Sequence, residues 1–264
     1  MRGAGCTYND IVDQDLDAQV ERTALRPLPA GTVSTKQAWI WLFAQCAVGL
    51  VVLLCLPRLA QIISLCSIPL VAAYPFMKRI TWWPQLWLGM TFNWAVLVAY
   101  AAKTGSVSLP LFILYAGLIF WTVGYDTIYA CQDIEDDMKI GVKSTARRFG
   151  KRIKIWVTAF YGLFVLFALN SLWMAKGRHW FATRVAENSE WHYPLWPIPI
   201  NIFIGFTIYT LSLAVRFNPN DKPSCLRLFK SNWLAAGLLI LTLLAFSHSI
   251  WSVVVTNIDI TIRP

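Results

Sequence analysis

Ten of the 14 acidic residues in this sequence of 264 residues lie in two short segments, 9–21 and 126–137. A spacing of four residues recurs in both segments, at Asn9, Asp13, Asp17, Asp133 and Asp137. Side chains four residues apart lie on one face of a helix, where like charges repel each other. We therefore expect a cation between these carboxylates.

The ligands available at this spacing are carboxylate and amide oxygens, which favour a hard cation. Mg²⁺ usually binds proteins through a few carboxylates together with substrate phosphates. The predicted metal ligands are Asn9, Asp10, Asp13, Asp17, Asp133 and Asp137. Asp15, Glu21, Glu135 and Asp136 lie at other helical angles and fit this site less well.

Basic side chains accompany both acidic segments and are suited to binding a phosphate group. They are Arg22, Arg26, Lys78, Arg79, Lys143 and Arg147. A metal ion and several cations around one pocket would neutralise a diphosphate. The alternative is that these are ordinary charges at one face of a membrane protein, and for any single residue the sequence leaves both interpretations open.

Tyr125, Asp126 and Tyr129 lie on one helical face at the end of an apolar run that leads into the second acidic segment. Tyrosines at a membrane edge are commonly interface anchors. The other interpretation is that all three residues belong to the predicted site.

A membrane helix bundle is the architecture predicted to position these residues. The chain has 57% hydrophobic residues, more than a typical soluble domain of this length. Apolar runs long enough to span a bilayer lie at 38–57, 59–77, 84–102, 108–131, 153–175, 197–215 and 233–254, with 1–21 as an incomplete eighth. They lack the alternation of β-barrel strands. We expect one all-α transmembrane domain over residues 1–264.

The distribution of basic residues predicts the orientation of this bundle. If the spans alternate in direction, loops 22–36, 78–83, 132–154 and 216–231 share one side and hold 16 of the 23 Lys and Arg. By the positive-inside rule this side faces the cytosol or the mitochondrial matrix. The formal charge of +9 therefore indicates membrane topology, and nucleic acid is not an expected partner.

With these two acidic segments, the sequence resembles the UbiA-type intramembrane aromatic prenyltransferases. Members carry an NDxxDxxxD motif followed by a basic loop, and a YDxxYAxxDxxxD motif followed by glycine and serine. The matching residues are Asn9, Asp10, Asp13, Asp17, Arg22, Arg26 and Pro27, then Tyr125, Asp126, Tyr129, Ala130, Asp133, Asp137, Gly141 and Ser144. The resemblance is strongest over residues 2–176.

The resemblance implies nine transmembrane helices around a central cavity, with both acidic motifs at its polar mouth and about seven to eight of these helices present here. Mg²⁺ would hold the diphosphate of an isoprenoid donor, and an aromatic ring would attack the resulting allylic cation. Asp13, Asp126, Asp133 and Tyr125 would take part in catalysis, and Tyr129 would join the basic residues in binding substrate. Other implied partners are an aromatic acid acceptor and the lipid bilayer.

Two specific functions are compatible with this resemblance. The Trp-rich later helices favour transfer of a farnesyl group to a phenolic polyketide acid in fungal meroterpenoid synthesis, in an endomembrane. The alternative is a 4-hydroxybenzoate polyprenyltransferase of ubiquinone synthesis in the mitochondrial inner membrane.

Two further expectations concern the ends and the class of the chain. Since the family has a first helix and part of a second before its first motif, we expect sequence upstream of Met1 or a shortened, inactive relative. A transporter is the rival class, but it would place ionisable groups near the middle of the spans.

Overall fold

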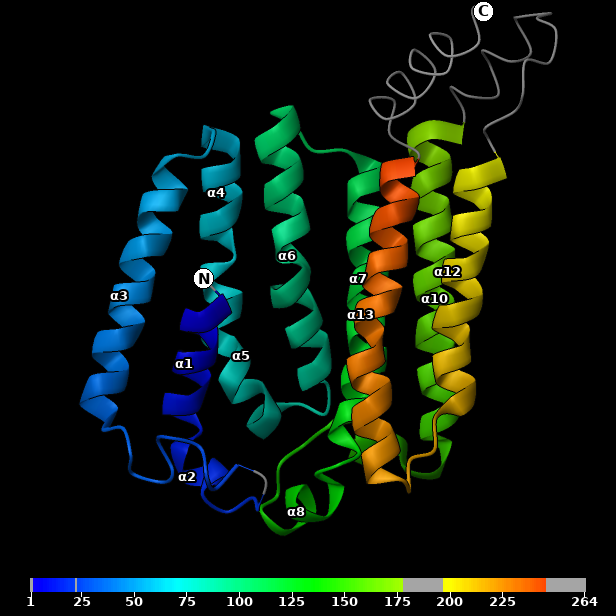
Figure 1. Ribbon diagram of the computed structural model, residues 1–264. Coiled ribbons are helices and arrows are strands. Elements are labelled where there is room, and N and C mark those ends of the chain that lie inside the picture. Colours follow the sequence, from blue (N-terminus) through cyan, green and yellow to red (C-terminus); the bar gives the residue numbers. More distant parts are fainter. Residues whose placement is uncertain (1, 22, 178–196, 246–264) are drawn as a thin grey trace, which may run out of the picture.

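The computed structural model describes residues 2–21, 23–177 and 197–245, and its regular elements are all helices (Figure 1). In chain order these are α1 (Arg2–Val12), α2 (Gln14–Asp17), α3 (Thr35–Leu54), α4 (Arg58–Cys66), α5 (Ile68–Ile80), α6 (Pro84–Thr104), α7 (Leu109–Ala130), α8 (Ile134–Lys139), α9 (Thr145–Phe149), η1 (Gly150–Arg152), α10 (Ile153–Leu172), η2 (Trp173–Gly177), α12 (Pro197–Arg216) and α13 (Lys222–Ala245). The expectation of an all-α bundle is confirmed.

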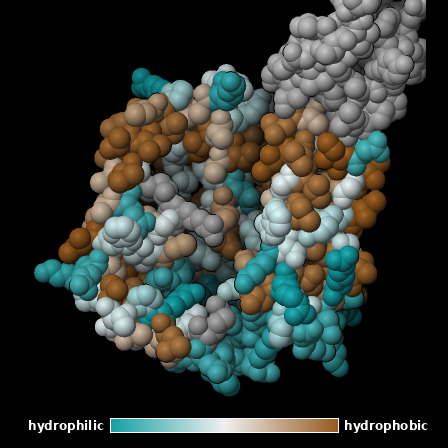
Figure 2. Space-filling model, in the orientation of Figure 1, coloured by the Kyte–Doolittle hydropathy of each residue, from teal (hydrophilic) through white to brown (hydrophobic). Residues whose placement is uncertain are grey.

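Most of the long helices are apolar on several sides, which is typical of helices surrounded by lipid. In the part of the chain that the structure describes, five segments are long and apolar enough to cross a bilayer, namely Thr35–Leu54, Arg58–Ile80, Leu109–Ala130, Thr145–Ala175 and Lys222–Ala245. On α3 the apolar side chains of Trp41, Phe43 and Leu54 are each more than 60% exposed. Figure 2 shows such residues along the sides of the bundle. The protein is a multi-pass integral membrane protein.

Two predicted spans differ from the observed helices. The second span is divided at Ser67 into α4 and α5. The last helix begins at Lys222, well before the predicted residue 233. The Asp221 carboxylate accepts a hydrogen bond from the Ser224 backbone N–H at 3.0 Å, so this polar beginning is capped as a helix before its apolar part starts.

The buried hydrophobic core lies mainly between α7, α10, α12 and α13. The rings of Trp121 on α7 and Phe164 on α10 are stacked with centroids 4.9 Å apart, and Phe164 and Phe206 meet edge to face. A Cβ atom at Gly117 of α7 would lie 2.8 Å from the Phe167 Cβ of α10. Because glycine has no side chain, these two helices approach closely there.

A buried amide joins three of these helices. Trp121 Nε1 donates to Asn232 Oδ1 at 2.8 Å, and the Tyr161 hydroxyl donates to the same oxygen at 3.1 Å. Asn232 Nδ2 in turn donates to the Leu228 carbonyl at 3.0 Å. Since buried polar groups are costly unless they are hydrogen-bonded, this amide fixes α13 against α7 and α10.

The connections that carry the acidic segments lie at one end of the bundle, at the bottom of Figure 1. Here the C-terminal end of α5 meets the beginning of α6, and α2 and α8 lie below the long helices. The Lys143 backbone N–H donates to the Lys78 carbonyl at 2.9 Å, which ties the loop before α9 to the end of α5. The fold therefore brings together segments that are far apart in the sequence.

Candidate functional site

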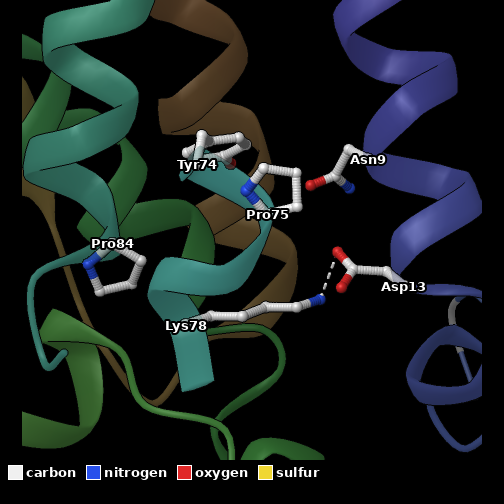
Figure 3. A pocket seen from close by; sticks show the side chains of 6 residues that line it. All are labelled: Asn9, Asp13, Tyr74, Pro75, Lys78 and Pro84. Atoms are coloured by element: carbon white, nitrogen blue, oxygen red, sulfur yellow. Dashed lines mark ion pairs between the residues drawn. The ribbon is translucent and has the colours of Figure 1, made fainter. Parts of the chain in front are cut away.

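The Asp13 carboxylate lies directly after α1, and its side chain is only 1% exposed. Lys78, near the end of α5, places its Nζ 2.6 Å from Asp13 Oδ2 (Figure 3). Arg79 donates to the Val12 carbonyl at 2.8 Å and lies 3.4 Å from Asp13 Oδ1. Two predicted phosphate-binding cations of α5 thus meet the central acid of the first motif.

Burial raises the pKa of the Asp13 carboxyl above its ordinary value, and the adjacent Lys78 ammonium offsets this effect only in part. Asp13 Oδ2 is buried and, among the described residues, receives no hydrogen bond of good geometry, although the Lys78 ammonium is close to it. A further cation at this oxygen would favour the ionised carboxylate.

Arg26 connects the other two acids of the first motif. Its guanidinium NH1 lies 3.0 Å from Asp10 Oδ1 and 2.9 Å from Asp17 Oδ2. The arginine therefore relieves the repulsion that was expected between these carboxylates. Asp17 is buried, and its backbone carbonyl accepts a hydrogen bond from the Thr23 hydroxyl at 2.8 Å.

The second acidic segment follows the end of α7. Asp126 lies in the last part of α7, Asp133 directly precedes α8, and Asp137 lies within α8. The exposed Glu135 instead pairs with Lys222 at the beginning of α13, at 2.9 Å, and this cation lowers the pKa of its carboxyl. Asp136 pairs with Lys139 at 3.0 Å.

A cavity of about 210 Å³ joins the two acidic segments. Asp17 from the first segment lines it together with Asp133 and Asp137 from the second. Its other predicted site residues are Lys78, Asp126, Tyr129 and Lys143. Carboxylates of both segments and two lysines therefore share one space, as expected for a site that binds a metal and a diphosphate.

A smaller cavity of about 100 Å³ lies next to Asn9 and Asp13 (Figure 3). Tyr74, Lys78 and Pro84 line both cavities, so the end of α5 and the beginning of α6 form a common wall. Within the described ranges, no three acidic, histidine or cysteine side chains converge at metal-binding distance. Arg26, Lys78 and Arg79 lie close to the carboxylates of the first segment instead.

Several predicted site residues do not line either cavity. Arg147 donates to the carbonyls of Asp137 and Val142, and its guanidinium lies over the Trp82 ring at 5.4 Å. Tyr125 packs against Phe229, with ring centroids 5.7 Å apart. Asp10, Arg26 and Arg79 also lie outside the two linings. Arg22 lies outside the described residues.

Tyr74 is a lining residue that the sequence reasoning missed as a site residue. It precedes Lys78 by four positions, so both side chains lie on the same face of α5. This spacing was the signal that could have identified it. Tyr129, the predicted tyrosine, lines the larger cavity and packs against Phe229 of α13 with ring centroids 4.5 Å apart.

Residues 1–232 match the UbiA prenyltransferase family. The chain is 52% identical over 161 residues to the mitochondrial 4-hydroxybenzoate polyprenyltransferase of Drosophila melanogaster, and 39% identical over 239 residues to that of Arabidopsis thaliana. These matches cover 61% and 89% of this chain but 41% and 54% of the relatives. The chain thus spans about half the length of the curated relatives it matches.

Solved structures of UbiA homologs share this fold. The apo structure of a UbiA homolog from Aeropyrum pernix K1 has a TM-score of 0.72 at 23% identity, covering 92% of this chain and 84% of that one. A UbiA homolog from Archaeoglobus fulgidus, bound to GPP and Mg²⁺, has a TM-score of 0.64 at 18% identity and covers 92% and 82%. At these identities the likeness establishes the fold.

The main functional expectation from the sequence was wrong. It favoured a farnesyl transferase of fungal meroterpenoid synthesis in an endomembrane, whereas both curated relatives are named mitochondrial 4-hydroxybenzoate polyprenyltransferases. The expectation depended on the tryptophans of the later helices. Of these, Trp173 is 55% and Trp233 is 73% exposed. Such side chains face the surroundings of the bundle and carry no information about the substrate.

Proposed function

Because the chain belongs to the UbiA prenyltransferase family, we propose that it transfers a polyprenyl group from its diphosphate to the aromatic ring of 4-hydroxybenzoate. The observation that carries the proposal is the cavity lined by carboxylates of both acidic segments and by Lys78 and Lys143. The names of the curated relatives support the acceptor. The alternative derived from the sequence, ubiquinone synthesis, thereby becomes the preferred one.

Mg²⁺ is the proposed cofactor. The available donors are carboxylate oxygens, which suit this hard cation, and the buried Asp13 Oδ2 lacks a well-directed hydrogen bond. Asn9, Asp10, Asp13, Asp17, Asp133 and Asp137 are the proposed ligands. When bound, Mg²⁺ supplies positive charge to the diphosphate leaving group. The Archaeoglobus homolog bound to GPP and Mg²⁺ supports this assignment.

Basic side chains at the cavity bind the diphosphate of the donor. Lys78 and Lys143 line the cavity, and Arg79 lies beside Lys78 at the end of α5. The Lys78 ammonium contacts Asp13, so it is held where a phosphate oxygen would meet both a cation and the proposed metal ligands. Charge-assisted hydrogen bonds of this type are stronger than neutral ones.

The reaction exchanges one bond at C1 of the donor for another. The C1–O bond breaks and its electron pair leaves with the diphosphate. A ring carbon of 4-hydroxybenzoate then bonds to C1 and loses its proton. Asp126 lines the cavity and, among the described residues, forms no ion pair with Lys or Arg, so its carboxylate accepts this proton. Tyr129, packed against Phe229, forms part of the wall that orients the ring.

The location of the protein follows from its orientation and its relatives. Loops 23–36, 78–83 and 132–154 lie at one end of the bundle, where Lys78, Asp133 and Lys143 line the cavity. Together with Arg22, these loops hold 12 of the 23 Lys and Arg. We place this end on the matrix side of the mitochondrial inner membrane, since the relatives are named mitochondrial. The apolar polyprenyl chain then lies in the bilayer beside the exposed apolar helices.

The test is transfer by the protein in liposomes supplied with geranyl diphosphate and 4-hydroxybenzoate. We expect a prenylated 4-hydroxybenzoate, detected by mass spectrometry, with Mg²⁺ and none after addition of EDTA. A product that still forms with EDTA would remove the metal from the proposal. Absence of product under all conditions, from protein that remains folded in the liposomes, would overturn the proposed function.

A further inference from the structure

Gln85 is an uncharged polar residue at the proposed site. It is not among the residues assigned to metal binding, phosphate binding or catalysis. It is the second residue of α6, follows Pro84, and is only 5% exposed. It lines the larger cavity together with Asp126, Lys78 and Lys143. A buried amide must satisfy both its oxygen and its NH₂ group, or the unsatisfied group destabilises the fold.

The orientation of this amide is fixed by a backbone group. Gln85 Oε1 accepts a hydrogen bond from the Thr145 N–H at 3.1 Å. Thr145 is the first residue of α9 and is fully buried, and the first N–H groups of a helix have no partner within it. Because an N–H donor can face only the oxygen of an amide, the NH₂ group of Gln85 must point the other way.

The Nε2 group is therefore left for the cavity. Among the described residues, no acceptor takes a hydrogen bond from Gln85 Nε2, whereas Oε1 is occupied by Thr145. An amide NH₂ group donates hydrogen bonds and does not ligate a metal through its nitrogen. Its ligand must therefore present a hydrogen-bond acceptor, and the nearby Lys78 and Lys143 favour one that carries negative charge.

We propose that Gln85 binds a substrate oxyanion, either a diphosphate oxygen of the donor or the carboxylate of the aromatic acid, by donating from Nε2. The assignment rests on the proposed function for the identity of these substrates. Thr145 positions the amide in advance, so no side-chain rotation is needed when the substrate enters. Gln85 is thus a substrate-binding residue in addition to the charged residues of the two acidic segments.

The decisive variant is Gln85→Glu, which keeps the shape and the oxygen that Thr145 uses but replaces the NH₂ donor with a second oxygen. We expect the apparent KM for one substrate to rise by about tenfold or more, because a charge-assisted hydrogen bond is lost and a repulsion is gained. The value for the other substrate should change less. The substrate whose KM rises identifies the oxyanion that Gln85 binds.

Gln37→Glu is the matched control. Gln37 lines neither cavity, and its Oε1 accepts a hydrogen bond from the Ser34 backbone N–H at 2.9 Å in the cap of α3, which a glutamate oxygen preserves. The control introduces the same charge at a glutamine whose NH₂ group is not involved. Its KM values should equal those of the unmodified protein.

A binding measurement separates this inference from the proposed reaction. Thermal unfolding is followed in detergent with Mg²⁺ and inorganic diphosphate, and separately with 4-hydroxybenzoate. In the unmodified protein at least one probe should raise Tm, and Gln85→Glu should lose the rise with that probe. An equal rise in both proteins, or no rise with either probe in the unmodified protein, overturns the inference. If the unmodified protein binds a probe but transfers no prenyl group, only the proposed function is contradicted.

A second variant covers the case in which Gln85→Glu fails to fold. Gln85→Met removes both polar atoms without adding charge. It should be less stable than the unmodified protein because the Thr145 N–H loses its acceptor, but it should show the same selective rise in KM. Unchanged KM values for both substrates in this variant would also overturn the inference.

Discussion

Lys78 and Asp13 form an ion pair in which Nζ lies 2.6 Å from Oδ2, and Lys78 also lines both cavities. The residue therefore links the first acidic segment to the space shared with the second. Its ammonium is placed to contact both a carboxylate and an entering diphosphate.

Lys78→Ala should chiefly raise the apparent KM for the prenyl diphosphate. A hydrogen bond to a charged group contributes about 1.5–3 kcal/mol, so we expect a rise of about tenfold to a hundredfold. The measurement is initial-rate kinetics at varied donor concentration. Lys151→Ala is the control, since Lys151 is exposed in η1 and does not line either cavity. An unchanged donor KM would remove Lys78 from the phosphate site.

Asp133→Asn should lower turnover and raise the Mg²⁺ concentration needed for half-maximal activity. Loss of a second-shell partner of a metal costs roughly 10- to 100-fold, and a direct ligand should cost at least as much. Asp136→Asn is the matched control because Asp136 lies three residues away and pairs with the exposed Lys139. Mg²⁺ titrations that coincide for Asp133→Asn and the unmodified protein would contradict the metal assignment.

Asp13→Asn should abolish transfer yet stabilise the protein in the absence of metal. Since the folded-state pKa of Asp13 is raised, this carboxyl contributes stability below its unfolded pKa and loses it as pH rises through the folded pKa. At pH 7 the uncharged amide of the variant avoids this loss of stability. Thermal unfolding in EDTA should therefore give a higher Tm for the variant at pH 7 and a smaller difference near pH 3. A lower Tm at pH 7 would show that the Lys78 and Arg79 contacts outweigh burial.

Asn232→Ala should destabilise the bundle without selective change in substrate affinity. It leaves the Trp121 and Tyr161 donors buried without an acceptor, at about 1–3 kcal/mol each, so a loss of about 2–6 kcal/mol is expected. Denaturant unfolding in detergent measures this loss. Ser231→Ala is the control, because the Ser231 hydroxyl bonds only locally to the Arg227 carbonyl at 2.8 Å. Equal stability of both variants would contradict the proposed role of the amide.

The sequence predicted which charged residues belong to the candidate site better than it predicted how they are arranged. Carboxylates are rare in membrane bundles, so their four-residue spacing identified Asp17, Asp133 and Asp137, which line one cavity. It did not predict that Asp13 would instead pair with Lys78 beside a smaller cavity. That separation depends on Lys78 and Arg79 of α5, which reach Asp13 from more than 60 residues away in the sequence, a contact that spacing within one segment does not contain.

Uncharged members of the site and the ends of helices were harder to predict. Tyr74 and Gln85 become functional candidates only because α5 and α6 meet at the cavity wall. In the sequence they resemble an interface tyrosine and a residue of a helix end. The beginning of α13 at Lys222 was missed because hydropathy reports where a helix enters lipid, whereas capping by Asp221 determines where it begins.

Pro75 lies inside α5, between Tyr74 and Lys78, the two α5 residues that line both cavities. Proline has no backbone N–H, so the carbonyl one turn earlier lacks its usual helical donor and the ladder is interrupted at this point. The hydrogens of backbone amides next to such a gap exchange with solvent through local openings that need less free energy than those of a continuous helix. The wall shared by both cavities therefore contains an interruption of its helical hydrogen bonds, and a small bend there would change the two volumes together.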